Sequence, residues 1–86
     1  MDIVKYKKDN FEVKDGVLSL NDKGINSIDN IEGLQYIQNL LMIYLWKNKI
    51  TEIKGLGKFK ELITLDLHNN QISTISGLKN LVNLKI

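Results

Sequence analysis

Hydrophobic residues recur along this chain at a fixed step of 22 positions. The phrase I-x-G-L occurs at 31–34, 53–56 and 75–78. Other apolar positions keep the same step, namely Ile28, Ile50 and Ile72, then Ile37, Phe59 and Leu81, and then Leu40, Leu62 and Leu84. A period of this length predicts stacked units, because one such unit cannot bury its apolar face alone.

Within each unit, apolar and polar positions alternate over a short stretch. The spacing L-x-x-L-x-L-x-x-N-x-I is clearest in "LITLDLHNNQI" at 62–72 and recurs in "LLMIYLWKNKI" at 40–50. Successive side chains of a strand point to opposite faces, so the pair Ile43 and Leu45 is expected to point inward, as is its counterpart Leu65 and Leu67. The pattern therefore predicts parallel strands, about 4.8 Å apart, that bury these pairs between neighbouring units.

This spacing resembles the leucine-rich repeat, in the short 22-residue form found in bacterial internalins and in a eukaryotic phosphatase regulatory subunit. "LSLNDKGI" at 18–25 matches the strand half of a first unit, with a step of 25 to the next. The resemblance implies an α/β solenoid: a right-handed coil with a short parallel β-sheet on its concave face and 3₁₀ or short helical turns on its convex face. It also implies a protein–protein interaction module, although a repeat type does not identify the partner.

Asparagine recurs where each predicted strand ends. Asn48 and Asn70 carry both donors and an acceptor, so they are expected to satisfy backbone groups of adjacent turns. The alternative is that they are ordinary turn-forming residues. Lys23 stands at the equivalent place in the first unit and cannot accept a hydrogen bond, which is expected to be tolerable near a cap. On the convex side, "LGKFKEL" at 56–62 has apolar residues at three-residue steps, which predicts a 3₁₀ or single-turn helical piece.

The two ends depart from the period. Residues 1–16 are interpreted as an N-terminal cap and residues 17–86 as about three repeats plus an incomplete fourth. Asp15-Gly16 is a two-residue hairpin signal, so residues 11–14 are expected to run antiparallel to the first repeat strand. A short helix and loop over residues 2–16 is the alternative.

The C-terminal stretch "GLKNLVNLKI" at 77–86 reproduces the convex part of a fourth unit. An uncovered terminal unit offers unpaired backbone groups to another chain. We therefore expect a homo-oligomer, a homodimer in the simplest case, formed through the C-terminal edge, while the front part of a longer array is the alternative. The residues assigned to self-association are Leu81, Leu84 and Ile86.

Three large side chains occupy outward positions of the second predicted strand. In the repeat frame Met42, Tyr44 and Trp46 face the concave side, with Val17, Ser19 and Asn21 on one side. A patch of this kind usually marks a binding site, and these residue types are enriched in interface cores. Alternatively they simply cover the sheet, or the N-terminal segment folds over them through Phe11 or Tyr6. The predicted partner-binding residues are Met42, Tyr44, Trp46, Thr64, Asp66 and His68.

Composition and charge narrow the function. The chain of 86 residues has 12 basic residues, all lysine, against 10 acidic ones. Without arginine or a basic cluster we expect no nucleic-acid partner. There is no cysteine and a single histidine, so we expect no metal and no other cofactor. Asp66 and His68 could act as a base and its orienter, but no nucleophile is predicted beside them, so we expect no enzyme activity.

Neither a secretory signal nor an apolar run of the ~20 residues that span a bilayer is visible in the sequence. We therefore expect a cytoplasmic protein with no membrane partner.

Overall fold

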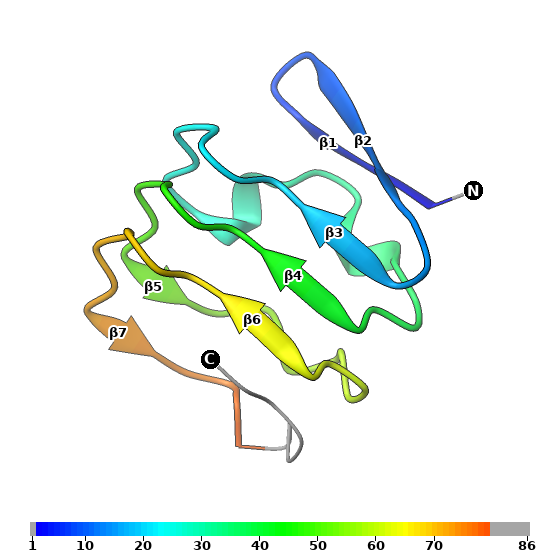
Figure 1. Ribbon diagram of the computed structural model, residues 1–86. Coiled ribbons are helices and arrows are strands. Elements are labelled where there is room, and N and C mark those ends of the chain that lie inside the picture. Colours follow the sequence, from blue (N-terminus) through cyan, green and yellow to red (C-terminus); the bar gives the residue numbers. More distant parts are fainter. Residues whose placement is uncertain (1, 80–86) are drawn as a thin grey trace.

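Three short parallel strands form the main sheet of the protein, which is described here from a computed structural model covering residues 2–79 (Figure 1). The strands are β3 (Val17–Ser19), β4 (Met42–Tyr44) and β6 (Thr64–Asp66), in the spatial order β3-β4-β6. Met42 lies opposite Val17 on one side and Thr64 on the other, which is the register predicted from the 25- and 22-residue steps.

The inward residues of these strands form the core. Ile43 and Leu65 have 1% and 0% of their surface exposed, while the residues on either side of each are half-buried. The predicted alternation of inward and outward side chains is therefore confirmed. The isoleucines and leucines of the 22-residue period join the same cluster, among them Ile28, Ile50, Leu40, Leu62 and Leu56.

A second pair of strands lies on the side opposite the main sheet. β5 (Glu52–Ile53) and β7 (Thr74–Ile75) are parallel neighbours. These two strands were not predicted, although Ile50 and Ile53 recur at the 22-residue step as Ile72 and Ile75.

Short helical turns occur between the strands, as expected, but the stretch 56–62 contains no helix. Two 3₁₀ helices, η1 (Ile28–Asn30) and η2 (Leu34–Tyr36), lie in the first unit. The stretch 56–62 instead forms separate turns, in which the N–H groups of Phe59 and Leu62 donate to carbonyls three residues earlier. These bonds have the three-residue spacing of a 3₁₀ turn, but they are not consecutive, so the predicted helical piece at 56–62 is present only as isolated turns.

The N-terminal residues form an antiparallel hairpin of β1 (Asp2–Tyr6) and β2 (Asp9–Val13). The alternative of a short helix in this region is wrong. The Asp15-Gly16 turn is present, with both residues at positive φ and a single bridge joining Lys14 to Val17. The strand partner of β2 is β1, so the antiparallel pairing with the first repeat strand stops at that bridge.

β1 attaches the hairpin to the first repeat unit. The backbone groups of Lys5 and Glu32 exchange two hydrogen bonds of 2.8 and 2.7 Å. Val4 is fully buried, and the Tyr6 hydroxyl donates to the Gly24 carbonyl over 3.4 Å. The hairpin therefore covers the apolar end of the core beside the first repeat.

Candidate functional site

The outward side chains of the main sheet gather on one surface, which we call the sheet face. Three columns of residues make up this surface, one from each strand and the residues that follow it. The register places Tyr44 between Ser19 and Asp66. The sheet face consists of Val17, Ser19 and Asn21; Met42, Tyr44 and Trp46; and Thr64, Asp66 and His68.

Buried amides hold the ends of these columns in place. The Asn48 side chain is 5% exposed; its oxygen accepts from the N–H groups of Lys23 and Ile25, both at 3.0 Å. Its nitrogen donates to the carbonyls of Leu20 and Leu45, at 3.0 and 2.9 Å. The amide thus bridges two neighbouring units through their backbones, as the sequence predicted.

Asn70 repeats this arrangement one unit later. Its oxygen accepts from the Ile50 N–H, and its nitrogen donates to the carbonyls of Leu45 and Leu67. The interpretation of these asparagines as ordinary turn formers is therefore wrong. Lys23, at the equivalent place in the first unit, is exposed, and its ammonium lies 5.3 Å from the Phe11 ring centroid.

The middle column presents three large side chains in line. Met42, Tyr44 and Trp46 are each half-buried, and the Tyr44 hydroxyl lies 3.5 Å from the Met42 sulfur. The Asn21 side-chain oxygen accepts a hydrogen bond of 2.9 Å from the backbone N–H of Trp46. The sequence had placed Asn21 only as a neighbour of this column. The column is therefore a continuous sulfur and aromatic surface whose backbone is bonded on the β3 side.

Trp46 is also packed against the β6 column. Its ring stacks on the His68 imidazole with centroids 5.8 Å apart and an angle of 13° between the planes. The register predicted these two residues as neighbours, and the structure places their rings face to face. The alternative in which Tyr6 covers this column is not what the structure shows, because Tyr6 is buried in the core and bonded to Gly24.

Asp66 and His68 form a contact on the same strand face. The Asp66 Oδ1 accepts the His68 backbone N–H at 3.2 Å and lies 2.5 Å from the imidazole Nδ1. This is the geometry of a base and its orienter. Among the described residues, no hydroxyl is hydrogen-bonded to the other ring nitrogen, and no group of three His, Cys, Asp or Glu gathers to hold a metal. The pair can orient a ring and carry charge on the sheet face.

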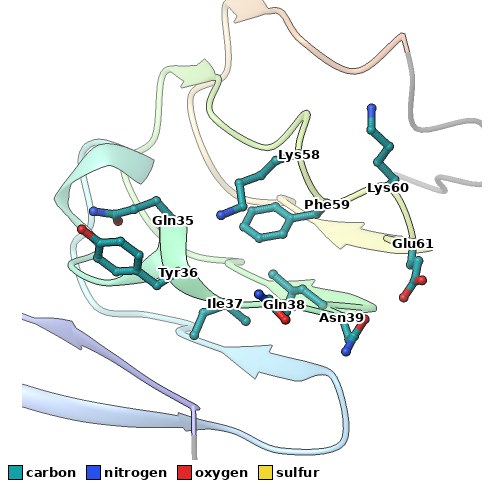
Figure 2. A pocket seen from close by; sticks show the side chains of 10 residues that line it. Gln35, Tyr36, Ile37, Gln38, Asn39, Lys58, Phe59, Lys60 and Glu61 are labelled. Carbon is teal, nitrogen blue, oxygen red and sulfur yellow. The ribbon is translucent and has the colours of Figure 1, made fainter.

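A hollow of about 510 Å³ lies away from the sheet face, between η2 and the turn at 58–61 (Figure 2). Tyr36 stands at its edge with 78% of its surface exposed, and the Lys58 ammonium lies 5.3 Å from the Phe59 ring centroid. The sequence analysis missed this feature, although an aromatic residue between the buried Leu34 and Ile37 was a visible signal. Its rim consists of long polar side chains, which lose rotamer freedom on binding, so it is a weaker candidate than the sheet face.

A second hollow opens beside β6. Its lining combines apolar residues with the polar outward residues of β6, and Ile75 there is 61% exposed. The residues predicted to mediate self-association, Leu81, Leu84 and Ile86, lie outside the described residues. In the part of the chain that the structure describes, no helix has the length and apolar character needed to cross a membrane.

Comparison with known proteins identifies the repeat. A family model described as leucine-rich repeats, in two copies, matches residues 38–80, which is 43 of the 86 residues. Searches of curated proteins and of solved structures gave no match. The match spans the strands β4 and β6, the Asn48 and Asn70 bridges and the pairs Ile43–Leu45 and Leu65–Leu67, and leucine-rich repeats are typically non-enzymatic modules for protein–protein interaction. The sequence period, the stacked parallel strands and this match lead to one conclusion: the chain belongs to the leucine-rich repeat family.

Proposed function

We propose that this protein is a non-catalytic interaction module that binds a protein partner on its sheet face, centred on Met42, Tyr44 and Trp46. In this proposal the repeats form a right-handed solenoid in the cytoplasm, and the sheet face is its concave side. The observation that carries the proposal is the line of half-buried Met, Tyr and Trp side chains on the outward side of β4. Trp and Tyr dominate interface energetics because each contributes a large contact area at low entropic cost.

The size of the sheet face limits the partner. Three short strands about 4.8 Å apart form a small surface. Its area is less than the ~800 Å² that each side of a standard stable interface buries. An α-helix with its side chains is about 10 Å wide, which matches this surface. The partner is therefore a helix or a short segment, or two copies of this protein act together on a larger one.

A matched pair of alanine variants tests the proposal. Trp46→Ala is expected to weaken partner binding by about 2 kcal/mol or more, as a central aromatic contact does. Tyr36 is 78% exposed and lies away from the sheet face, so Tyr36→Ala is expected to leave binding unchanged. Proteins captured by wild type are identified, and their affinities for the three chains are measured by calorimetry. A direct partner that binds Trp46→Ala as tightly as wild type would refute the proposal.

Self-association is a second candidate function, favoured by the hollow beside β6. Ile75 is exposed there next to the half-buried Ile72, and an exposed sheet edge beside apolar residues can pair with another chain. Light scattering at tens of micromolar tests this candidate. A dimer that Ile75→Asp or Leu84→Asp dissociates would support it, whereas a monomeric wild-type chain would exclude it and leave the first proposal standing.

A further inference from the structure

The orientation of Trp46 depends on groups outside its own strand. Its backbone is fixed by the bond from its N–H to the Asn21 side chain, but that bond does not set the direction of the ring. The ring itself stacks on the His68 imidazole, at 5.8 Å between centroids. His68 is therefore the side chain that restricts where the indole can lie.

His68 is in turn held by Asp66. One carboxylate oxygen, Oδ1, receives both the backbone N–H and the ring Nδ1 of His68. The Asp66 side chain is 28% exposed and the His68 side chain 61%, so the carboxylate is the more sheltered end of the pair. The chain of contacts runs from a sheltered carboxylate, through an exposed imidazole, to the indole at the end of the Met–Tyr–Trp column.

We propose that Asp66 and His68 are positioning residues that hold the Trp46 ring in one orientation, and that protonation of His68 strengthens this hold. The inference rests on the proposed function for its purpose, because an indole fixed before docking loses less conformational entropy when a partner binds. It assigns Asp66 and His68 a supporting role, whereas the sequence predicted direct contact with the partner.

The pH response follows from the two contacts of the imidazole. A protonated ring makes a charge-assisted hydrogen bond to Asp66 and places a cation against the face of the indole, and both interactions are stronger than those of the neutral ring. The other charged group beside the indole is Lys47, whose ammonium lies 6.0 Å from the Trp46 ring centroid. His68 is the only histidine of the chain, so a response between pH 5 and 8 that is lost in His68→Gln is assigned to its imidazole.

The composition of the chain makes the test direct. Trp46 is the only tryptophan and His68 the only histidine, so the tryptophan fluorescence comes only from the indole that stacks on His68. Acrylamide quenching of the wild-type protein is expected to be roughly two-fold weaker at pH 5.5 than at pH 8, because the protonated ring shields the indole more firmly. His68→Gln is expected to be quenched strongly at both pH values.

Two further variants separate positioning from a merely structural role. His68→Phe keeps a flat ring that cannot titrate, so quenching should be weaker than in His68→Gln and independent of pH. Asp66→Asn should show a smaller pH response than wild type, because the anionic partner of the imidazole is gone. Circular dichroism and urea midpoints at pH 8 should be similar for all four chains, since these side chains lie on the outer face.

Two results would overturn the inference: wild-type quenching that does not change between pH 5.5 and 8, or a change that persists in His68→Gln. These measurements need no partner, so they succeed or fail independently of the Trp46→Ala binding test. If Trp46→Ala loses the partner but wild-type quenching does not depend on pH, the proposed binding face stands. The positioning role of Asp66 and His68 is then refuted.

Discussion

Replacing Asn48 by alanine would test how far a single buried amide stabilises the stack of repeats. The side chain now serves five backbone groups in two units, of which the Trp46 carbonyl would keep its bond from the Asp22 N–H. After the substitution, the Lys23 N–H can reach water because that residue is exposed, and the Leu45 carbonyl keeps its bond from Asn70. The Ile25 N–H and the Leu20 carbonyl belong to residues with no exposed surface and would lose the Asn48 amide as their partner.

The expected magnitude follows from these two groups. A buried polar group left without a partner costs about 1 to 3 kcal/mol, so Asn48→Ala should lower the free energy of unfolding by about 2 to 6 kcal/mol. A domain of this length has a total of about 4 to 13 kcal/mol. The substitution therefore removes a large share of the stability.

Urea denaturation, monitored by Trp46 fluorescence and by circular dichroism, measures the loss of unfolding free energy. An unchanged m-value shows that the same unfolding transition is observed. Asn70→Ala provides a milder comparison, because Asn70 is only half-buried and water can reach part of its site; about 1 to 3 kcal/mol is expected. Asn26→Ala, at an exposed position, should stay within about 0.5 kcal/mol of wild type. The reasoning is refuted if Asn48→Ala costs less than Asn70→Ala or no more than Asn26→Ala.

Three further predictions concern other parts of the fold. Leu65→Ala should cost about 2 to 5 kcal/mol of unfolding free energy because it empties a fully buried site. Trp46→Ala, at a half-buried outward position, should cost clearly less. Urea midpoints that reverse this order would contradict the inward and outward assignment. Lys47 has a φ of 58°, a left-handed conformation that its counterpart Asn69 shares at 60° and that suits asparagine better than lysine. Lys47→Asn should therefore raise stability by about 0.5 to 1 kcal/mol. Lys49 does not have a positive φ, so Lys49→Asn should give no such gain. The hydrogen bond and charge of Asp29, 3.0 Å away, raise the pKa of Lys54 above its ordinary 10.5. The stability from this contact is therefore fully present below pH 10.5 and is lost as the pH rises past the folded-state pKa. The difference in Tm between wild type and Lys54→Met should shrink as the pH passes that value, and a constant difference would argue against the ion pair.

The sequence predicted those parts of the fold that the repeat period determines. Ile43 and Leu65 are inward because each unit must bury its strand pair against the next, and Asn48 is buried because only a side chain with both donors and an acceptor serves both units. These requirements are local and recur, so one chain displays each of them more than once. The neighbour relation of Trp46 and His68 followed from the same register.

Features outside the period could not be predicted in the same way. The pairing of β1 with β2, and the bridge from Lys5 to Glu32, join segments that occur once and depend on long-range packing. The hydrogen bond from the His68 ring to the Asp66 carboxylate depends on rotamers, which a register does not determine. The exposure of Tyr36 arises because η2 turns that side chain away from a core already filled by Leu34 and Ile37.

The β5–β7 pair has a consequence for the curvature of the stack. It joins the unit of β4 to the unit of β6 on the far side, where backbone bonds continue from Gln71 to Ser76, so these two units are held at strand spacing on both sides. On the same side, the units of β3 and β4 share the bond from Lys49 to Ile25, and beyond it the 3₁₀ helix η1 stands where a strand would pair. Units fixed at equal spacing on opposite sides stay parallel, whereas units tied mainly along one side can fan apart. Between the first two units this side has, besides that bond, only the exposed ion pair of Asp29 and Lys54 among the contacts described above, so we expect any bend of the sheet face to be larger there than in the half that carries Trp46 and His68.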